Sequence, residues 1–366
     1  MDRWSLPGPA VFIEGVMHAL RDGANVVVGA SAPFAAALSC ALEDRIAHEW
    51  RLTGPLAPSD LPPLNELYAA LEVDDNPSKR RSVAALLAGI ESKRVIMVTG
   101  VGALQWPAWQ LFLNDFAHVS RSFSAMDRTQ LLLITAGVPK TKLPKKAPAL
   151  IAFIWDGVVG EADVFSYVTQ ALRQKGIRID AQAKLSARII TRLALWDFDL
   201  VDHLVKLDAR ELFDPSAVVC AACNNMAALQ QLGNTWEEGG LAEFDGEPLK
   251  HAAAILKEDD PQGELAMRLW AAQAAELLPA LEIKRRQLAN RMKAARMPLP
   301  IRLNDELIHD LADVEIGSLL HLARTHRLPR DIQRIAEKFK GLRNKLAHLC
   351  PLEAEEALDP EVLAVR

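Results

Sequence analysis

The sequence NVVVG at residues 25–29 has the pattern of a short buried strand that ends in glycine, and it decides the fold expected for the first part of the chain. A continuous apolar run of this length is typical of a parallel sheet covered on both faces. The alanine-rich residues 30–46 follow it and predict a helix. Similar apolar runs, separated by helical patterns, occur at 94–99, 130–135 and 150–155. Strands that alternate with helices predict an α/β domain with a parallel sheet over residues 1–165.

The turn after this first strand occupies the place of a phosphate-binding loop, which follows the pattern G-x-x-x-x-G-K-[ST]. Counting from Gly29, the second glycine position holds Phe34, the lysine position Ala35 and the hydroxyl position Ala36. The lysine that grips the β- and γ-phosphates is therefore absent, as is the hydroxyl that holds Mg²⁺. We expect no ATP hydrolysis and no cofactor at this position.

The second predicted strand also lacks a residue that nucleotide hydrolysis requires. Residues 94–99 end in Thr99, and Gly100 follows, where an acid would be needed to order a metal-bound water. The layout of residues 10–160 resembles the P-loop NTPase fold, in its AAA+ or signalling-ATPase branch, although both nucleotide motifs depart from the family pattern. The resemblance implies a non-hydrolysing domain used for assembly or sensing. The alternative is a different doubly wound α/β domain that never bound a nucleotide.

Cysteine content and hydropathy limit the cellular compartment and the metal sites that the sequence is compatible with. The chain has four cysteines, which fits a reducing compartment. Cys220 and Cys223 form a lone C-x-x-C without a second ligand pair, so we expect two small buried side chains and no metal site. No uncharged stretch approaches the roughly 20 residues that span a bilayer, and no export signal is visible at the first residues. These features predict a soluble cytoplasmic protein without membrane contact.

The rest of the chain has helical periodicity. Residues 166–250 are expected to form a helical middle region that ends near the Gly- and acid-rich loop 233–247. Residues 251–366 are expected to form an all-α bundle. Its predicted helices span residues 264–292, 303–311, 315–325, 330–349 and 354–365.

Charge is unevenly distributed within this predicted bundle. Residues 284–345 hold 15 Lys and Arg against 7 Asp and Glu, in a chain of net charge -5. A basic region inside an acidic protein is an electrostatic footprint for a polyanion. The alternative is a set of solvated helix faces that pair with the acidic part of the chain. The candidate nucleic-acid-binding residues are Lys284, Arg285, Arg286, Lys340 and Lys345.

The predicted helix 330–349 carries the candidate chemistry. Its apolar residues recur at steps of three and four and predict one buried stripe: Ile332, Ile335, Phe339, Leu342, Leu346 and Leu349. Asn344 and His348 lie four residues apart, on one face beside this stripe. Arg343 is adjacent and long enough to reach the same patch. A cation, an amide and an imidazole are therefore expected together at the edge of a packed helical core.

The phrase LRNKLAHL at residues 342–349 resembles the R-x-x-x-x-H signature of the HEPN family. The resemblance covers residues 256–366 and implies metal-independent RNA cleavage by a dimer whose two motifs face one cleft. Carried over, Arg343 and His348 would be catalytic and Asn344 would support them. The chemistry is reasonable, because an imidazole can exchange the 2′-OH proton near neutrality and a guanidinium can hold the phosphate.

Two functions of different classes follow from these patterns. The first is an effector, of the kind found in prokaryotic toxin or antiviral-defence systems, whose NTPase-like domain senses or assembles and whose HEPN-like domain cleaves or binds RNA. The second is a non-enzymatic scaffold or pseudo-ATPase subunit of a larger defence or clamp-loader-like complex. Expected partners are RNA, a second copy bound through the C-terminal helical domain, or a larger protein complex. Loss of Arg343 or His348 discriminates the two, since only the effector requires them.

Overall fold

The computed structural model describes residues 2–73, 80–125, 127–303 and 306–364. The chain divides into two compact units. The first comprises residues 1–163 and 223–254, and the second comprises residues 164–222 and 255–366. The predicted middle region, 166–250, therefore contributes residues to both units.

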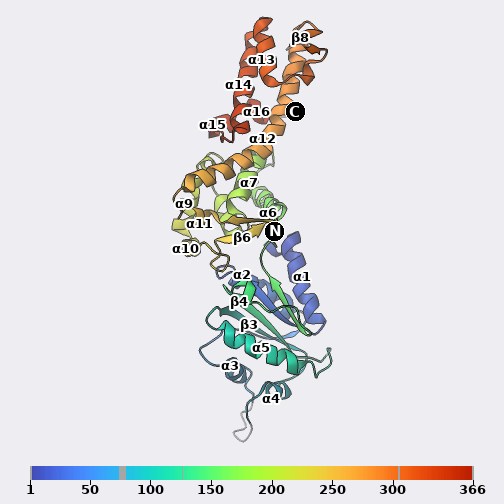
Figure 1. The fold of residues 1–366 in the computed structure, drawn as a ribbon, viewed down its shortest axis with the longest axis vertical. Helices are drawn as coiled ribbons and strands as arrows, with labels where there is room; N and C mark the ends of the chain where they lie inside the picture. Colours follow the sequence, from blue (N-terminus) through green and yellow to red (C-terminus); the bar gives the residue numbers. More distant parts are fainter. Residues whose placement is uncertain (1, 74–79, 126, 304–305, 365–366) are drawn as a thin grey trace. The chain divides into compact units, whose positions relative to one another are not determined.

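A five-stranded parallel sheet forms the centre of the first unit, in the order β2-β3-β4-β1-β5 (Figure 1). The strands are β1 (Asn25–Ala30), β2 (Arg51–Leu56), β3 (Arg94–Gly102), β4 (Gln130–Ala136) and β5 (Leu150–Ile154). The predicted strand at 25–29 is the most enclosed, since β1 lies between β4 and β5, with Val27 opposite Leu133 and Ala152. A strand with neighbours on both sides and helices on both faces has no polar face, which explains its continuous apolar sequence.

Helices cover both faces of this sheet. They are α1 (Pro7–Arg21), α2 (Ala35–Ala47), α3 (Pro63–Ala70), α4 (Val83–Ala88) and α5 (Trp106–Ser120). Val26 and Val28 of β1 point into a core with α1 and α2, whereas Val27 points into a core with α3, α4 and α5. Successive residues of a strand face opposite sides, so one strand supplies both cores. The predicted parallel α/β fold is confirmed for this part of the chain.

The strand β2 overlaps residues 53–65, whose Pro- and Gly-rich sequence predicts a surface loop and not a strand. β2 is an edge strand whose residues are exposed or half-buried. It contains Gly54 and Pro55, and its register with β3 shifts beside them. Proline is tolerated on an edge strand, where an N–H is not needed for pairing. The tertiary position at the sheet edge decides this strand, and no local apolar run announces it.

Residues 223–254 complete the first unit. They include α10 (Ala227–Gln230), β6 (Leu241–Phe244), β7 (Glu247–Lys250) and α11 (Ala252–Ile255), the last of which ends one residue beyond the unit. Two hydrogen bonds from backbone N–H groups to aspartate side chains hold the antiparallel hairpin β6–β7: Glu243 N–H donates to Asp156 Oδ1 at 2.9 Å, and Glu161 N–H donates to Asp245 Oδ1 at 3.1 Å.

The second unit is mostly helical, with α6 and α9 including residues of both units. Its helices are α6 (Glu161–Gln174), α7 (Ala181–Ala194), α8 (Phe198–Leu204), α9 (Pro215–Asn225), α12 (Pro261–Ala294), α13 (Ile316–Thr325), α14 (Arg330–Ala347), α15 (Ala354–Ala357) and α16 (Pro360–Leu363). The short 3-10 helices of the chain are η1 (Arg3–Ser5), η2 (Lys140–Lys142), η3 (Glu211–Phe213) and η4 (Leu311–Asp313). α12 contains Pro279 and packs against both α7 and α14. The predicted helical character of the C-terminal region is confirmed.

Two local expectations in this part of the chain are wrong. Residues 303–311 are predicted as a helix, but Leu303 ends β8 (Ile301–Leu303), which pairs antiparallel with β9 (Glu306–Ile308), and η4 begins at Leu311. Residues 304 and 305 of this prediction lie outside the described residues. A short apolar run does not distinguish the two periods. Cys220 of α9 is exposed and Cys223 is half-buried, so the pair is not the buried one expected. Among the described residues, no helix is both long and apolar enough to cross a membrane.

Candidate functional site

The end of α14 carries the sequence-predicted catalytic residues. The helix runs to Ala347, and His348 is its C-terminal cap, with its N–H donating to Asn344 O at 3.0 Å. Leu349 then adopts a left-handed conformation with φ of 60°. Its N–H donates to Leu346 O at 3.3 Å. These are features of a Schellman ending, in which a left-handed residue lets the chain bend back over the last carbonyls of a helix.

Two side chains of α12 fix this helix end. The Trp270 indole N–H donates to Leu346 O at 2.7 Å. Gln273, one turn further along the helix, donates from Nε2 to Leu352 O at 2.9 Å and accepts from Leu352 N–H at 2.6 Å. The last carbonyls of a helix have no partner within the helix, and Leu346 O accepts both from the Trp270 indole and from Leu349 N–H. The segment that bears His348 is thus held at both of its ends.

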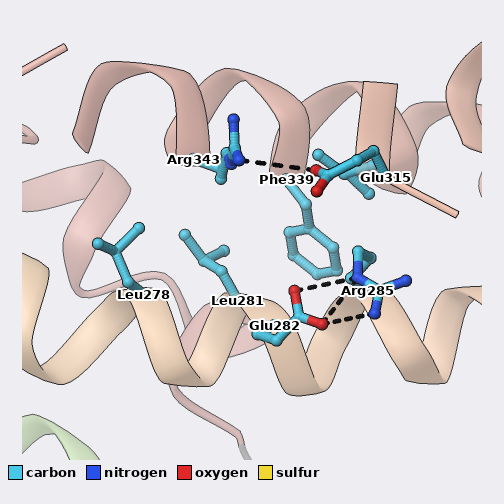
Figure 2. Close-up of a pocket in the computed structure, with 8 residues that line it drawn as sticks. Leu278, Leu281, Glu282, Arg285, Glu315, Phe339 and Arg343 are labelled. Atoms are coloured by element: carbon cyan, nitrogen blue, oxygen red, sulfur yellow. Dashed lines mark hydrogen bonds and ion pairs between the residues drawn. The ribbon is translucent and has the colours of Figure 1, made fainter. Parts of the chain in front are cut away.

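Arg343 lies at a cavity of 210 Å³ between α12, α13 and α14 (Figure 2). Its guanidinium Nη2 is 3.6 Å from Glu315 Oε2, the residue just before α13. Both side chains remain accessible, with exposed fractions of 47% for Arg343 and 73% for Glu315. The cavity floor is apolar and includes Leu281 and Phe339. An accessible guanidinium beside an apolar wall is suited to hold an anionic group.

Arg285 lines the same cavity but is committed to the protein itself. Its Nη1 donates to Ala312 O and to Val314 O, each at 2.7 Å. Its Nε donates to both carboxylate oxygens of Glu282, at 2.9 and 3.0 Å. This hydrogen bond from Arg285 is the main cause that lowers the pKa of Glu282. Arg285 therefore anchors the segment before α13 to α12, and a nucleic acid would have to break these bonds to reach it.

Two of the other candidate nucleic-acid-binding residues, Lys284 and Lys345, are also bonded within the protein. Lys284 donates to Ala364 O, and Lys345 pairs with Glu356 at 2.5 Å. Arg286 is exposed, and Lys340 is half-buried on α14. Further lysines and arginines of α14 pair with acids near the end of the chain, as Lys338 does with Asp359. Much of the positive charge in residues 284–345 is thus compensated locally, which is the alternative reading of the charge distribution.

The cavity beside Arg343 does not bring the three candidate catalytic residues together. Arg343 lines the cavity between the helices, whereas Asn344 and His348 are not among its lining residues. His348 is exposed at the helix end, and Asn344 is half-buried. Five residues along an ideal α-helix rotate the direction of a side chain by about 140°, so this spacing places Arg343 and His348 on different sides of the helix end. A reaction that needs both would require a second copy to complete the site.

In the first unit, the chain itself covers the place of the phosphate loop. After β1, Ala32 N–H donates to Glu237 O at 3.0 Å. Gly239 approaches Pro33 so closely that an added Cβ would lie 2.8 Å from Pro33 Cγ. The backbone amides of Phe34 and Ala35 both donate to Ser31 O at 3.2 Å. Three of the amides that would cradle a phosphate therefore already have partners in the protein.

The sequence predicts this covering segment, residues 233–240, as part of a loop between domains and does not predict its packing against the loop after β1. Its signal was the group of glycines at 233, 239 and 240. Gly239 has φ of 80°, and an added Cβ on Gly240 would lie 1.6 Å from Gly233 O. A cluster of glycines at such close approaches marks a segment packed directly against other backbone.

Comparisons with known proteins add little to this geometry. No family model matches the chain, and no curated protein matches it. Among solved structures, AMPPCP-bound DnaA from Aquifex aeolicus is similar with a TM-score of 0.32 and 11% identity, over 91% of this chain and 92% of that one. A likeness at this level carries no argument. The fold and the site define a protein with one parallel α/β unit and one helical unit.

Proposed function

We propose that this protein is a two-unit effector. Its α/β unit serves in sensing or assembly without hydrolysing a nucleotide, and its helical unit binds and cleaves RNA. The observation that carries the proposal is the end of α14, where accessible Arg343 and His348 stand on a backbone fixed by Trp270 and Gln273. Side chains that do chemistry need such a rigid support and access to solvent.

The chemistry of the proposal is that of metal-independent RNA cleavage. RNA carries its own nucleophile, the 2′-OH, whose proton the His348 imidazole takes as the oxygen attacks the neighbouring phosphorus. A second imidazole returns a proton to the departing 5′-oxygen. Arg343 compensates the charge that develops on the phosphate. Since each chain supplies one Arg343 and one His348 on different sides of α14, a pair of chains provides acid, base and cation together.

The test is cleavage of mixed RNA by the purified protein in EDTA, with His348→Ala beside the wild type. We expect cleavage by the wild type, leaving cyclic or 3′-phosphate ends, and a loss of about 10²-fold or more in the variant. His321→Ala is the matched control, because His321 is an exposed imidazole on α13 outside the motif. Equal cleavage by the wild type and His348→Ala contradicts the proposal, as does its absence in the wild type.

A second function, a non-enzymatic scaffold, is favoured by the internal pairing of the basic residues. Lys284, Arg285 and Lys345 all have acceptors within the helical unit, so they leave less charge for a polyanion. This function predicts that Arg343→Ala together with His348→Ala leaves self-association unchanged in sedimentation experiments. It also predicts that the wild type shows no saturable RNA binding by fluorescence anisotropy.

A further inference from the structure

The ion pair between Arg343 and Glu315 differs from the other contacts of the cavity. Its separation of 3.6 Å exceeds the about 2.7–2.9 Å of a charge-assisted hydrogen bond. Glu315 is the N-terminal cap residue of α13, yet its side chain makes no capping hydrogen bond there. Figure 2 shows this ion pair between Arg343 of α14 and Glu315, the residue just before α13, as a dashed line. A pair this open and this long contributes little to stability.

The neighbouring acid of the cavity is held quite differently. Glu282 receives bonds from Nε and Nη2 of Arg285, so its charge is compensated within α12. Glu282 also lies near enough to Arg343 for that cation to contribute to its lowered pKa, after the larger effects of Arg285 and Arg286. Glu315 is therefore the carboxylate whose position decides whether the guanidinium of Arg343 is available to another anion.

The cavity has room for that anion. Its volume of 210 Å³ is several times the roughly 30 Å³ share of one water molecule. The apolar side chains of Leu278, Leu281 and Ile316 line it next to the charged pair. Half of the lining residues are apolar, so water screens the charges there less than at a fully open surface, and an anion that replaces Glu315 beside Arg343 is attracted more strongly than at such a surface.

We propose that Glu315 is a positioning residue that competes with an RNA phosphodiester for Arg343. Without RNA, its carboxylate keeps the guanidinium over the cavity. When RNA binds, a phosphate oxygen takes the place of the carboxylate, and Glu315 swings into solvent. The identity of the ligand rests on the proposed function, whereas the competition rests on the geometry of Arg343 and Glu315.

The experiment measures binding of a short fluorescein-labelled oligouridylate by anisotropy, at low salt and in EDTA. All variants carry His348→Ala so that RNA stays intact. Glu315→Gln removes the competing charge with little change in shape, and we expect binding about two- to fivefold tighter, the range of an exposed ion pair. Glu315→Asp keeps the charge and should bind like the parent. The gain should shrink as salt rises.

Glu337→Gln is the matched control. Glu337 is an exposed acid of the same unit, paired with Arg324 at 2.7 Å, so its loss changes the net charge equally without touching Arg343. A merely structural role for Glu315 is tested by adding Arg343→Gln, which should abolish the gain of Glu315→Gln. The inference is overturned if Glu315→Gln binds no tighter than Glu337→Gln, if its gain survives the loss of Arg343, or if no variant binds RNA.

Failure of this inference is distinguishable from failure of the proposed function. Binding that tightens through Arg343 while the His348-containing protein never cuts RNA supports the competition and contradicts cleavage. Cleavage that depends on His348, with equal binding by Glu315→Gln and Glu337→Gln, supports the proposed function and contradicts the competition.

Discussion

Leu349 has an unusual conformation for a leucine. Its φ of 60° lies in the left-handed region, which costs an L-residue about 1–2 kcal/mol and glycine nothing comparable. The side chain is 52% exposed, so its removal sacrifices little burial. A conformation this costly, two residues after Ala347 and next to His348, is where backbone strain and function often coincide.

Leu349→Gly should therefore stabilise the helical unit by about 0.5–1 kcal/mol, after the greater backbone entropy of unfolded glycine is subtracted. Leu349→Ala is the control, since alanine keeps the strain, and it should give no such gain. Urea unfolding followed by circular dichroism measures both variants. An equal effect of the two substitutions would show that the left-handed conformation is not what limits stability there.

Glu361 links the stability of the helical unit to pH. Hydrogen bonds from Lys338 and Arg334, at 2.8 and 3.1 Å, lower the pKa of its carboxyl from 4.5 to about 2. A depressed pKa stabilises the folded state above the unfolded value, and this contribution is lost as pH falls from about 4.5 to about 2. The carboxylate is 42% exposed, so screening limits the contribution to about 1 kcal/mol or less.

We expect Glu361→Gln to be less stable than the wild type near neutral pH, with a difference that shrinks through this acid window. Parallel urea titrations at several pH values measure the difference directly. A constant difference down to the lowest pH would mean that the two basic side chains do not hold the carboxylate in its charged form.

At the scale of elements, α14 shows what periodicity can predict. The stripe of apolar residues predicted the helix at 330–349, and its buried residues include Ile332, Phe339, Leu342 and Leu346. Ile335 is half-buried and Leu349 exposed, so the stripe ends with the helix at Ala347. The anchoring of that end by Trp270 and Gln273 joins residues more than 70 positions apart, and no local pattern encodes it.

Gln273 offers a test of this anchoring, because its side chain is fully buried and satisfies both polar groups of the Leu352 backbone. Gln273→Ala leaves a buried N–H and a buried C=O without these partners, and each costs about 1–3 kcal/mol. We expect a loss of about 2–6 kcal/mol in unfolding free energy. Hydrogen exchange should also show faster exchange at the Leu352 amide.

Asn290→Ala provides the control for Gln273→Ala. Asn290 is an exposed amide side chain on the same helix, α12, and alanine is the better helix former. Its replacement should leave stability unchanged or slightly raised. Equal losses from the two substitutions would contradict a specific role of Gln273 at the end of α14.

At the scale of the whole molecule, the α/β unit is closed by a segment distant in sequence. Residues 233–240 cover the loop after β1, where the resemblance to P-loop proteins placed a nucleotide position. The α/β unit is therefore completed by a distant segment of its own chain. It also makes Gly239 critical, since an added Cβ would meet Pro33 Cγ at 2.8 Å and Leu232 Cδ2 at 3.0 Å.

Gly239→Ala should lower the melting temperature of the α/β unit much more than Gly246→Ala. Both glycines have similar left-handed backbones, with φ of 80° and 84°, but an added Cβ on Gly246 meets nothing within 4 Å. The shared strain costs about 1–2 kcal/mol, and the clash at Gly239 adds about 1–3 kcal/mol. Differential scanning calorimetry of the two variants isolates the packing effect. Equal shifts would mean that the segment does not press on the loop after β1.

The sequence by itself determined four of the five strands, most helices of the second unit and the loss of the phosphate-loop residues. These features are local, because burial of a strand or of a helix face imposes a period of apolar residues that is visible within a short stretch of sequence. The loss of the phosphate-loop residues is likewise visible in the sequence alone, from the identities of Phe34, Ala35 and Ala36.

Only the tertiary structure decided the edge strand β2, the order of the sheet, the segment that covers the loop after β1 and the partners of each charged side chain. The cavity beside Arg343 and the contact of Arg343 with Glu315 belong to this second group. The physical reason is the same in every case. Such contacts join residues distant in sequence, and their energies depend on which surfaces the packed core brings together, which no local period records.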